Sequence, residues 1–308
     1  EIILGNSTEG YKNNNIKDLS NSVSANNKLL EILNIENLTG VSGSLPVQDI
    51  PSIKEIYARG SGIESVTFAR NGLIHKAELP ESLSDLRLYD LYYLNDLSIE
   101  DYNSLLVFVC ENTPNIDEKA IIENSPNLIR IRATNIDWTG RRSLDNASLL
   151  MRLAECKGID ANNQNTDLPV LTGKVEIGSI RQSEIQLFNE LWPELQLIYD
   201  ESDIIPQFSI NFYREVGDET PIYSILKDEM YTLTSEDDPS QMLINQGLLV
   251  KEMTPQYTYL FDSWTPDIEG VLVTQNLDFY GKFTPVIRQY TVKWYSDDDE
   301  RTLLEEVK

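Results

Sequence analysis

Histidine and cysteine are scarce in this chain of 308 residues, which holds one histidine, His75, and two cysteines, Cys110 and Cys156. A site built from several histidines is impossible, and a Ser-His-Asp or Cys-His catalytic arrangement would have to use His75. Two cysteines form neither a metal cluster nor a disulfide framework. A glycine-rich phosphate-binding loop is also missing. We therefore expect a protein that is not an enzyme and that uses no metal ion and no cofactor.

Basic residues are half as frequent as acidic ones, with 25 Lys and Arg against 50 Asp and Glu and a net charge of −25. Nucleic-acid phosphates require clustered Lys and Arg, so we expect no nucleic-acid partner. Docking on an anionic membrane surface is disfavoured for the same reason. The longest apolar run, Leu105 to Cys110, is far shorter than the roughly 20 residues of a spanning helix, so we expect no membrane insertion. The composition indicates a soluble acidic protein of two or more domains.

Apolar residues in the first two thirds of the chain recur with one short spacing. Ile53, Ile56 and Ala58 stand at offsets zero, three and five. The same spacing recurs in Leu30–Leu33–Ile35, Ile63–Val66–Phe68, Leu83–Leu86–Leu88, Leu128–Ile131–Ala133 and Trp192–Leu195–Leu197. Offsets three and five lie on one face of a short strand. An asparagine at offset eight, such as Asn71, turns the chain and hydrogen-bonds free backbone groups.

Most successive copies are separated by about 20 to 24 residues, the length of one strand and a return segment. The step from Ile56 to Val66 is only ten residues. One of these two copies is therefore expected to be the return side, itself a short strand. Near the end of the series, Lys174 to Asp200 predicts a closing unit with strands Val175–Ile177 and Leu195–Ile198 around a helix Ser183–Leu191.

The series resembles a leucine-rich repeat solenoid over residues 28–205. The resemblance implies an α/β fold in which each repeat buries its apolar edge against its neighbours, with residues 1–27 as an N-terminal cap or linker. The two cysteines then stand two strand spacings apart, roughly 10 Å. A disulfide needs Cα atoms within about 7 Å, so two free thiols are expected.

After residue 205 the pattern changes to alternating aromatic strands. Phe208–Phe212 and Tyr290–Trp294 align without a gap at an offset of 82. Between them stand a Phe-x-x-Trp-x-Pro segment at Phe261 and a Tyr-Gly-Lys-Phe segment at Tyr280. These features resemble the Listeria–Bacteroides repeat, a β-grasp-like unit of internalins and gut-bacterial surface proteins.

The resemblance implies one β-grasp-like module over residues 206–288 and the start of a second, truncated module over residues 289–308. We therefore expect the natural protein to continue beyond Lys308. The first residue is Glu1 rather than Met, which fits either a removed leader or a fragment.

In a leucine-rich repeat, the positions that flank the buried strand residues face the concave side. Here they form a basic and aromatic row: Tyr57, Arg59, Arg87, Tyr89, Phe108, Arg130, Arg132, Arg152 and Lys174. Arg and Tyr are frequent at binding hot spots, and Arg pairs with carboxylates. The row predicts a site for an acidic protein or an anionic glycan. Alternatively, the arginines pair with Glu55, Asp85, Glu155 and Glu176 on neighbouring repeats.

Two acidic clusters, Asp237–Asp238 and residues 297–300, are either calcium ligands or solvated turns. His75 is expected in a loop or on the convex face. The resemblance implies a noncatalytic, extracellular binding or adhesion protein displayed on a cell surface, with the repeats as recognition face and the modules as stalk. The alternative is a structural or receptor-binding component of a phage virion, in a capsid or tail appendage. The oligomeric state is left open.

Overall fold

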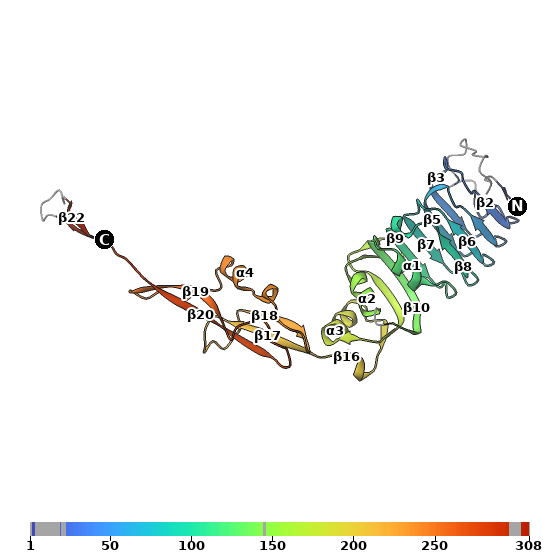
Figure 1. Cartoon of the computed structure of the whole chain (residues 1–308). Coiled ribbons are helices and arrows are strands. Elements are labelled where there is room, and N and C mark those ends of the chain that lie inside the picture. The colour runs from blue at the N-terminus through green and yellow to red at the C-terminus, as the bar shows by residue number, and fades with distance from the viewer. Residues whose placement is uncertain (1, 4–18, 20–22, 144–145, 296–302, 308) are drawn as a thin grey trace. The chain divides into compact units, whose positions relative to one another are not determined.

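The computed structural model describes residues 2–3, 19, 23–143, 146–295 and 303–307 (Figure 1). The chain divides into two compact units, Glu1–Ile204 and Ile205–Lys308. This division lies one residue from the boundary expected after residue 205. Residues 4–18 and 20–22 of the expected N-terminal cap, and residues 296–302 of the expected second module, lie outside the described part.

The first unit contains two sheets, and the strands from β2 to β9 alternate between them along the chain (Figure 1). One sheet has five strands in the order β1-β2-β4-β6-β8, all parallel to their neighbours. They span Ile2–Ile3 (β1), Ile32–Asn34 (β2), Glu55–Tyr57 (β4), Lys76–Leu79 (β6) and Asp96–Ile99 (β8).

The other sheet has nine strands, with β3, β5, β7, β9, β10, β11 and β12 in spatial order, β13 beside β10, and β15 beside β13. Only β12 runs antiparallel to its neighbour, β11. The strands span Ser42–Gln48 (β3), Gly62–Ala69 (β5), Asp85–Tyr89 (β7), Val107–Glu111 (β9), Arg130–Ser143 (β10), Lys157–Ile159 (β11), Asn165–Thr166 (β12), Val170–Ile177 (β13) and Leu195–Ile198 (β15).

Helices and short strands complete the first unit. The helices are α1 (Glu118–Asn124), α2 (Asn146–Ala154) and α3 (Gln182–Leu191), with 3₁₀ turns at Tyr102–Ser104 and Glu201–Asp203. The short strands are β14 (Ile180–Arg181) and β16 (Ile204–Ile205). The expected closing unit of strand, helix and strand is confirmed as β13, α3 and β15.

The core of the first unit lies between the two sheets and is made of the residues with the repeated spacing. Ile53, Ile56 and Ala58 are fully buried, as are the corresponding residues of the next two copies. Asn71, at offset eight, is also buried, and its side chain bonds the backbone in both directions. Its Nδ2 donates to the carbonyl of Val47 at 2.6 Å, and its Oδ1 accepts from the backbone N–H of Ile50 at 3.0 Å. The role expected for this asparagine is confirmed.

A polar edge runs along the ends of strands β3 to β10 in the nine-stranded sheet. Left-handed residues with φ between 52° and 59° directly follow β3, β5, β7 and β9, and one lies in β10 just after its pairing with β9 ends: Asp49, Arg70, Asp90, Asn112 and Asn135. The parallel register stacks these residues beside one another. Their side chains bond along the stack, Arg70 to Asp49 at 2.7 Å, Asn112 to Asp90 at 2.9 Å and Asn135 to Asn112 at 3.0 Å. These hydrogen bonds connect each of these residues to the one on the neighbouring strand. Asp and Asn adopt the left-handed conformation more readily than most residues, because their short side chains can hydrogen-bond locally.

The expected fold class, an α/β leucine-rich repeat solenoid with a C-terminal β-grasp-like module, is wrong. The chain is mainly β-sheet, with 41% of residues in strands and 15% in helices, and its sheets curl into half-barrels. The physical reason is that the repeated spacing marks the strands of both sheets. Ile56 lies in β4 of one sheet and Val66 in β5 of the other. The ten-residue step crosses from one sheet to the other, and both copies are strands.

The second unit is built on a four-stranded sheet of order β18-β17-β20-β19. The two central strands are parallel and each outer strand is antiparallel to its neighbour. The elements are β17 (Gln207–Tyr213), β18 (Tyr223–Asp228), a 3₁₀ turn (Ser235–Asp237), α4 (Ser240–Asn245), β19 (Tyr257–Thr265) and β20 (Leu277–Ile287). Phe212, Trp264 and Phe279 are the aromatic centre of its core. A separate hairpin follows, with β21 (Val292–Tyr295) antiparallel to β22 (Leu303–Val307).

Within the described residues, every helix is too short or too polar to cross a membrane. Cys110 and Cys156 are both buried free thiols. His75 is exposed just before β6, with its Nε2 at 3.6 Å from a carboxylate oxygen of Glu55.

Candidate functional site

The residues of the expected basic and aromatic row are divided between the two sheets. Tyr57 and Arg59 belong to the five-stranded sheet, at the end of β4 and just beyond it. The Tyr57 hydroxyl donates to Glu55 at 2.6 Å. Arg59 lies 3.1 Å from a carboxylate oxygen of Glu78. Both side chains are therefore bonded within the chain.

Arg87, Tyr89 and Arg132 share the outer face of the nine-stranded sheet, which is the face turned away from the core. Arg87 forms a two-pronged ion pair with Asp85, with both N–O distances at 2.9 Å. This pair raises the pKa of the Arg87 guanidinium, chiefly through the hydrogen bond to Asp85. Arg132 lies 3.1 Å from Glu111. Asp85 is one of the carboxylates expected to pair with these arginines, but it lies on the same strand as Arg87 rather than on a neighbouring repeat.

A loop of residues 160–164 crosses this outer face. Its Asn163, left-handed with φ 60°, accepts hydrogen bonds from the Tyr89 hydroxyl at 2.5 Å and from Arg87 at 3.2 Å. The loop follows β11, whereas Arg87 and Tyr89 lie on β7, with β9 and β10 in between. Val109 is the Cα partner of both Arg87 and Arg132 in the parallel register, so its side chain lies on the same face, and it is fully buried. The centre of the expected concave surface is therefore covered by the chain itself.

Replacing Asn163 by Gly is expected to release this loop. Glycine keeps the left-handed conformation at little cost, so the change removes mainly the two hydrogen bonds. Their loss should weaken loop closure by about 1–2 kcal/mol, which corresponds to amide exchange about 5- to 30-fold faster in residues 160–166. Hydrogen exchange with mass spectrometry measures this. Asn162→Ala is the matched control, and equal exchange in both variants would contradict the bridging role of Asn163.

The remaining four residues of the row lie in four different environments. Phe108 is fully buried in the core of the first unit and faces no ligand. Lys174 is exposed on β13. Arg130 opens β10, and Arg152 lies on helix α2 rather than on a strand. The predicted residues therefore do not form one continuous binding surface.

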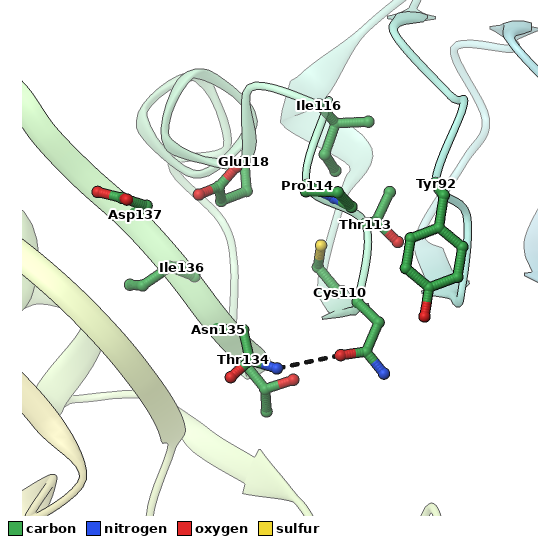
Figure 2. Close-up of a pocket in the computed structure, with 11 residues that line it drawn as sticks. Tyr92, Cys110, Thr113, Pro114, Ile116, Glu118, Thr134, Asn135, Ile136 and Asp137 are labelled. Carbon is green, nitrogen blue, oxygen red and sulfur yellow. Dashed lines mark hydrogen bonds between the residues drawn. The ribbon is translucent and has the colours of Figure 1, made fainter.

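A cavity of about 260 Å³ lies where strands β9 and β10 separate. The two strands are paired as far as Glu111 and Thr134. Beyond that point β10 continues beside β13, while the chain after β9 turns through a loop into α1. We call the resulting space the fork cavity (Figure 2). It is lined by Tyr92, Cys110, Asn112, Thr113, Pro114, Ile116, Glu118, Thr134, Asn135, Ile136 and Asp137.

Polar groups of the fork cavity are held in place by the surrounding structure. Asn135 donates from Nδ2 to Oδ1 of Asn112, the bond drawn in Figure 2. Glu118, only 8% exposed, accepts from the indole N–H of Trp138 at 3.1 Å. The hydroxyl oxygen of Thr134 is buried and makes no hydrogen bond within the described part of the chain. A buried polar group of this kind favours a ligand or a water molecule that bonds it.

One aromatic side chain, that of Tyr92, lines the fork cavity, and Tyr93 is the next residue in the chain. Tyr92 is 55% exposed and Tyr93 is 61% exposed. Both belong to the turn that follows β7, and the backbone carbonyl of Tyr92 accepts a hydrogen bond from the side chain of Asn115. The cavity thus combines fixed amides, carboxylates and an exposed aromatic ring.

The cavity thiol is poorly suited to nucleophilic chemistry. Burial raises the pKa of Cys110 strongly, and the nearby Glu118 carboxylate raises it further. The thiolate, which is the reactive form, is therefore disfavoured. Among the described residues, no three His, Cys, Asp or Glu side chains gather as a metal site would require. The arrangement suits binding by hydrogen bonds and aromatic contact.

The acidic pair Asp237–Asp238, considered as calcium ligands, is used inside the second unit. Asp237 forms an ion pair with Lys227. Asp238 accepts from the Trp264 indole at 2.9 Å and from the backbone N–H of Ser240 at 2.8 Å. The other cluster, residues 297–300, lies outside the described residues.

Sequence reasoning missed the fork cavity because its residues belong to no single repeat position. The available signal was Asn112 and Asn135, which stand at the same point of the register, just beyond the last paired residues of β9 and β10. Comparison with protein-family models, with curated proteins and with solved structures gave no match.

Proposed function

We propose that this chain is a noncatalytic binding protein whose first unit carries the recognition surface. The observation that carries the proposal is the fork cavity with the exposed Tyr92 in its lining. Tyrosine is enriched at protein–protein interfaces because it offers a large rigid ring and a hydroxyl. A protein ligand is therefore better supported than the anionic glycan that the basic row suggested.

The charge of the cavity indicates what part of a partner would enter it. Glu118 and Asp137 are carboxylates, and the lining contains no basic side chain. The negative charge of this lining favours a basic side chain of the partner, and the strongly acidic chain would attract such a partner from a distance.

The proposal includes display at an extracellular surface, with the second unit as a spacer. The spacer role is supported by the aromatic core of the second unit, which is separate from the core of the first. The high pKa of Cys110 and the exposed position of the single histidine favour a noncatalytic role.

A protein and glycan array probed with the intact chain tests this function. We expect a protein hit that Tyr92→Ala weakens about tenfold or more, since interface tyrosines contribute about 2 kcal/mol when truncated. Tyr290→Ala, in the second unit and 54% exposed, is the control and should leave the hit unchanged. Turnover of an arrayed substrate, or a hit lost only in Tyr290→Ala, would overturn the proposal.

A further inference from the structure

A second cavity, of about 390 Å³, lies at the start of strands β10 and β11. Arg130 and Lys157 are the first residues of these strands and are Cα partners in their parallel pairing. Arg152 reaches the cavity from helix α2. Three cationic side chains thus converge on one space from two strands and a helix.

Arg130 carries an unused hydrogen-bond donor at this cavity. Its Nε atom is buried and has no hydrogen-bond partner among the described residues. Leaving such a donor unpaired costs about 1–3 kcal/mol, and more for a charged group. An oxygen atom of a ligand at this position would remove that cost.

The other two cations have positions that suit the same ligand. Arg152 donates to the carbonyl oxygens of Ile122 and Ser125 at the end of helix α1, the second at 3.3 Å. These bonds fix its guanidinium beside the cavity. Lys157 is exposed. Within the described part of the chain, neither Arg152 nor Lys157 forms an ion pair with an acidic residue.

The local charge is opposite to that of the whole protein. Glu155 is the one acidic residue of the lining, so three cations against one carboxylate leave two positive charges. The chain as a whole has a net charge of −25. Arg87 and Arg132, on the outer face of the nine-stranded sheet, are by contrast paired with close carboxylates.

We propose that this cavity binds a tetrahedral oxyanion, a sulfate or phosphate group. Cations that approach from three elements surround a tetrahedral dianion better than a planar carboxylate, and Arg130 would contribute charge-assisted bonds through Nε and one Nη. The site is separate from the fork cavity. The proposal therefore does not depend on the function argued above, and either can fail alone.

Equilibrium dialysis of the intact chain against labelled sulfate, at constant ionic strength, tests the proposal. We expect saturable binding of one sulfate, weakened about tenfold or more in Arg130→Met, because a bidentate charged partner is lost. Lys157→Met, an exposed change that leaves the fold intact, should weaken binding a few-fold. Lys174→Met removes the same charge from β13 outside the cavity and should change affinity less than about twofold.

Further probes identify the source of the anion. Inorganic phosphate and glucosamine 6-sulfate are compared with sulfate: tighter binding of the ester points to a glycan-borne group, and tighter binding of the inorganic ions points to a free anion. Either result retains the site. Acetate that binds more tightly than sulfate would overturn the tetrahedral assignment. Absence of saturable binding, or equal affinity in wild type, Arg130→Met and Lys157→Met, would overturn the site itself.

Discussion

Truncation of Phe212 to Ala is expected to unfold the second unit while the first stays folded. Phe212 is fully buried, and its ring centroid lies 5.0 Å from Trp264 and 5.5 Å from Phe279. Loss of a buried phenylalanine costs about 3–5 kcal/mol. The core of this unit contains only a few large side chains, so this cost is a large part of a typical stability of about 5–15 kcal/mol.

Differential scanning calorimetry and tryptophan fluorescence measure the effect. Trp138 and Trp192 report on the first unit, and Trp264 reports on the second. We expect one transition of Phe212→Ala to move down by tens of degrees or vanish, with the other unchanged. Leu226→Ala, on the exposed outer strand of the same sheet, is the control. A single transition that shifts as a whole would contradict the division into two units.

The strands and the buried residues of the first unit could be predicted from the sequence. Residues such as Leu86 and Leu88 are fully buried, because the apolar spacing of a short strand determines which side faces the core. The closing elements β13, α3 and β15 were predicted for the same reason. Local periodicity therefore predicted the strands and the buried residues well.

The arrangement of those strands could not be predicted in the same way. Leu33, Ile56 and Ala77 have the same local pattern as Val66 and Leu86, yet the first three lie in one sheet and the last two in the other. Spacing shows that a strand has a buried face but does not show which sheet it joins. The leucine-rich repeat interpretation failed at this step.

The surface chemistry depended on contacts that are distant in sequence. Tyr89 and Asn163 are 74 residues apart, and their hydrogen bond covers the face on which the binding row was expected. Glu118 and Trp138 are 20 residues apart and meet only because β10 runs past α1. No repeat position predicts such pairs, so the fork cavity required the structure.

Stability of the first unit is expected to fall as the pH rises above about 9, with Cys110 as a main cause. Burial raises the pKa of this thiol, and Glu118 raises it further, from an ordinary value of 9.0. In the unfolded chain the thiol ionises near that ordinary value, whereas in the folded chain it keeps its proton. The folded state then holds more protons than the unfolded state, so the free energy of unfolding decreases with rising pH.

One such group contributes at most about 1.4 kcal/mol per pH unit, and about 1.4 kcal/mol in all between pH 7 and pH 10. Urea unfolding at pH 7, 8, 9 and 10 under reducing conditions, followed through the tryptophans of the first unit, measures it. Cys110→Ala loses some stability at every pH through the smaller side chain. Between pH 7 and pH 10, however, its free energy of unfolding should fall by about 1.4 kcal/mol less than that of the wild type.

Other groups act in the same direction, and the comparison between variants separates them. Burial also raises the pKa of Tyr89, and a hydrogen bond to Glu55 raises that of Tyr57, but both tyrosines are present in wild type and variant. Cys156→Ala should show a smaller difference, because the Arg152 charge partly offsets the effect of burial on the pKa of Cys156. If Cys110→Ala and the wild type lost stability in parallel up to pH 10, the thiol would be ionised in the folded protein. Burial would then not protect the thiol from ionisation, and one support for a noncatalytic role would be lost.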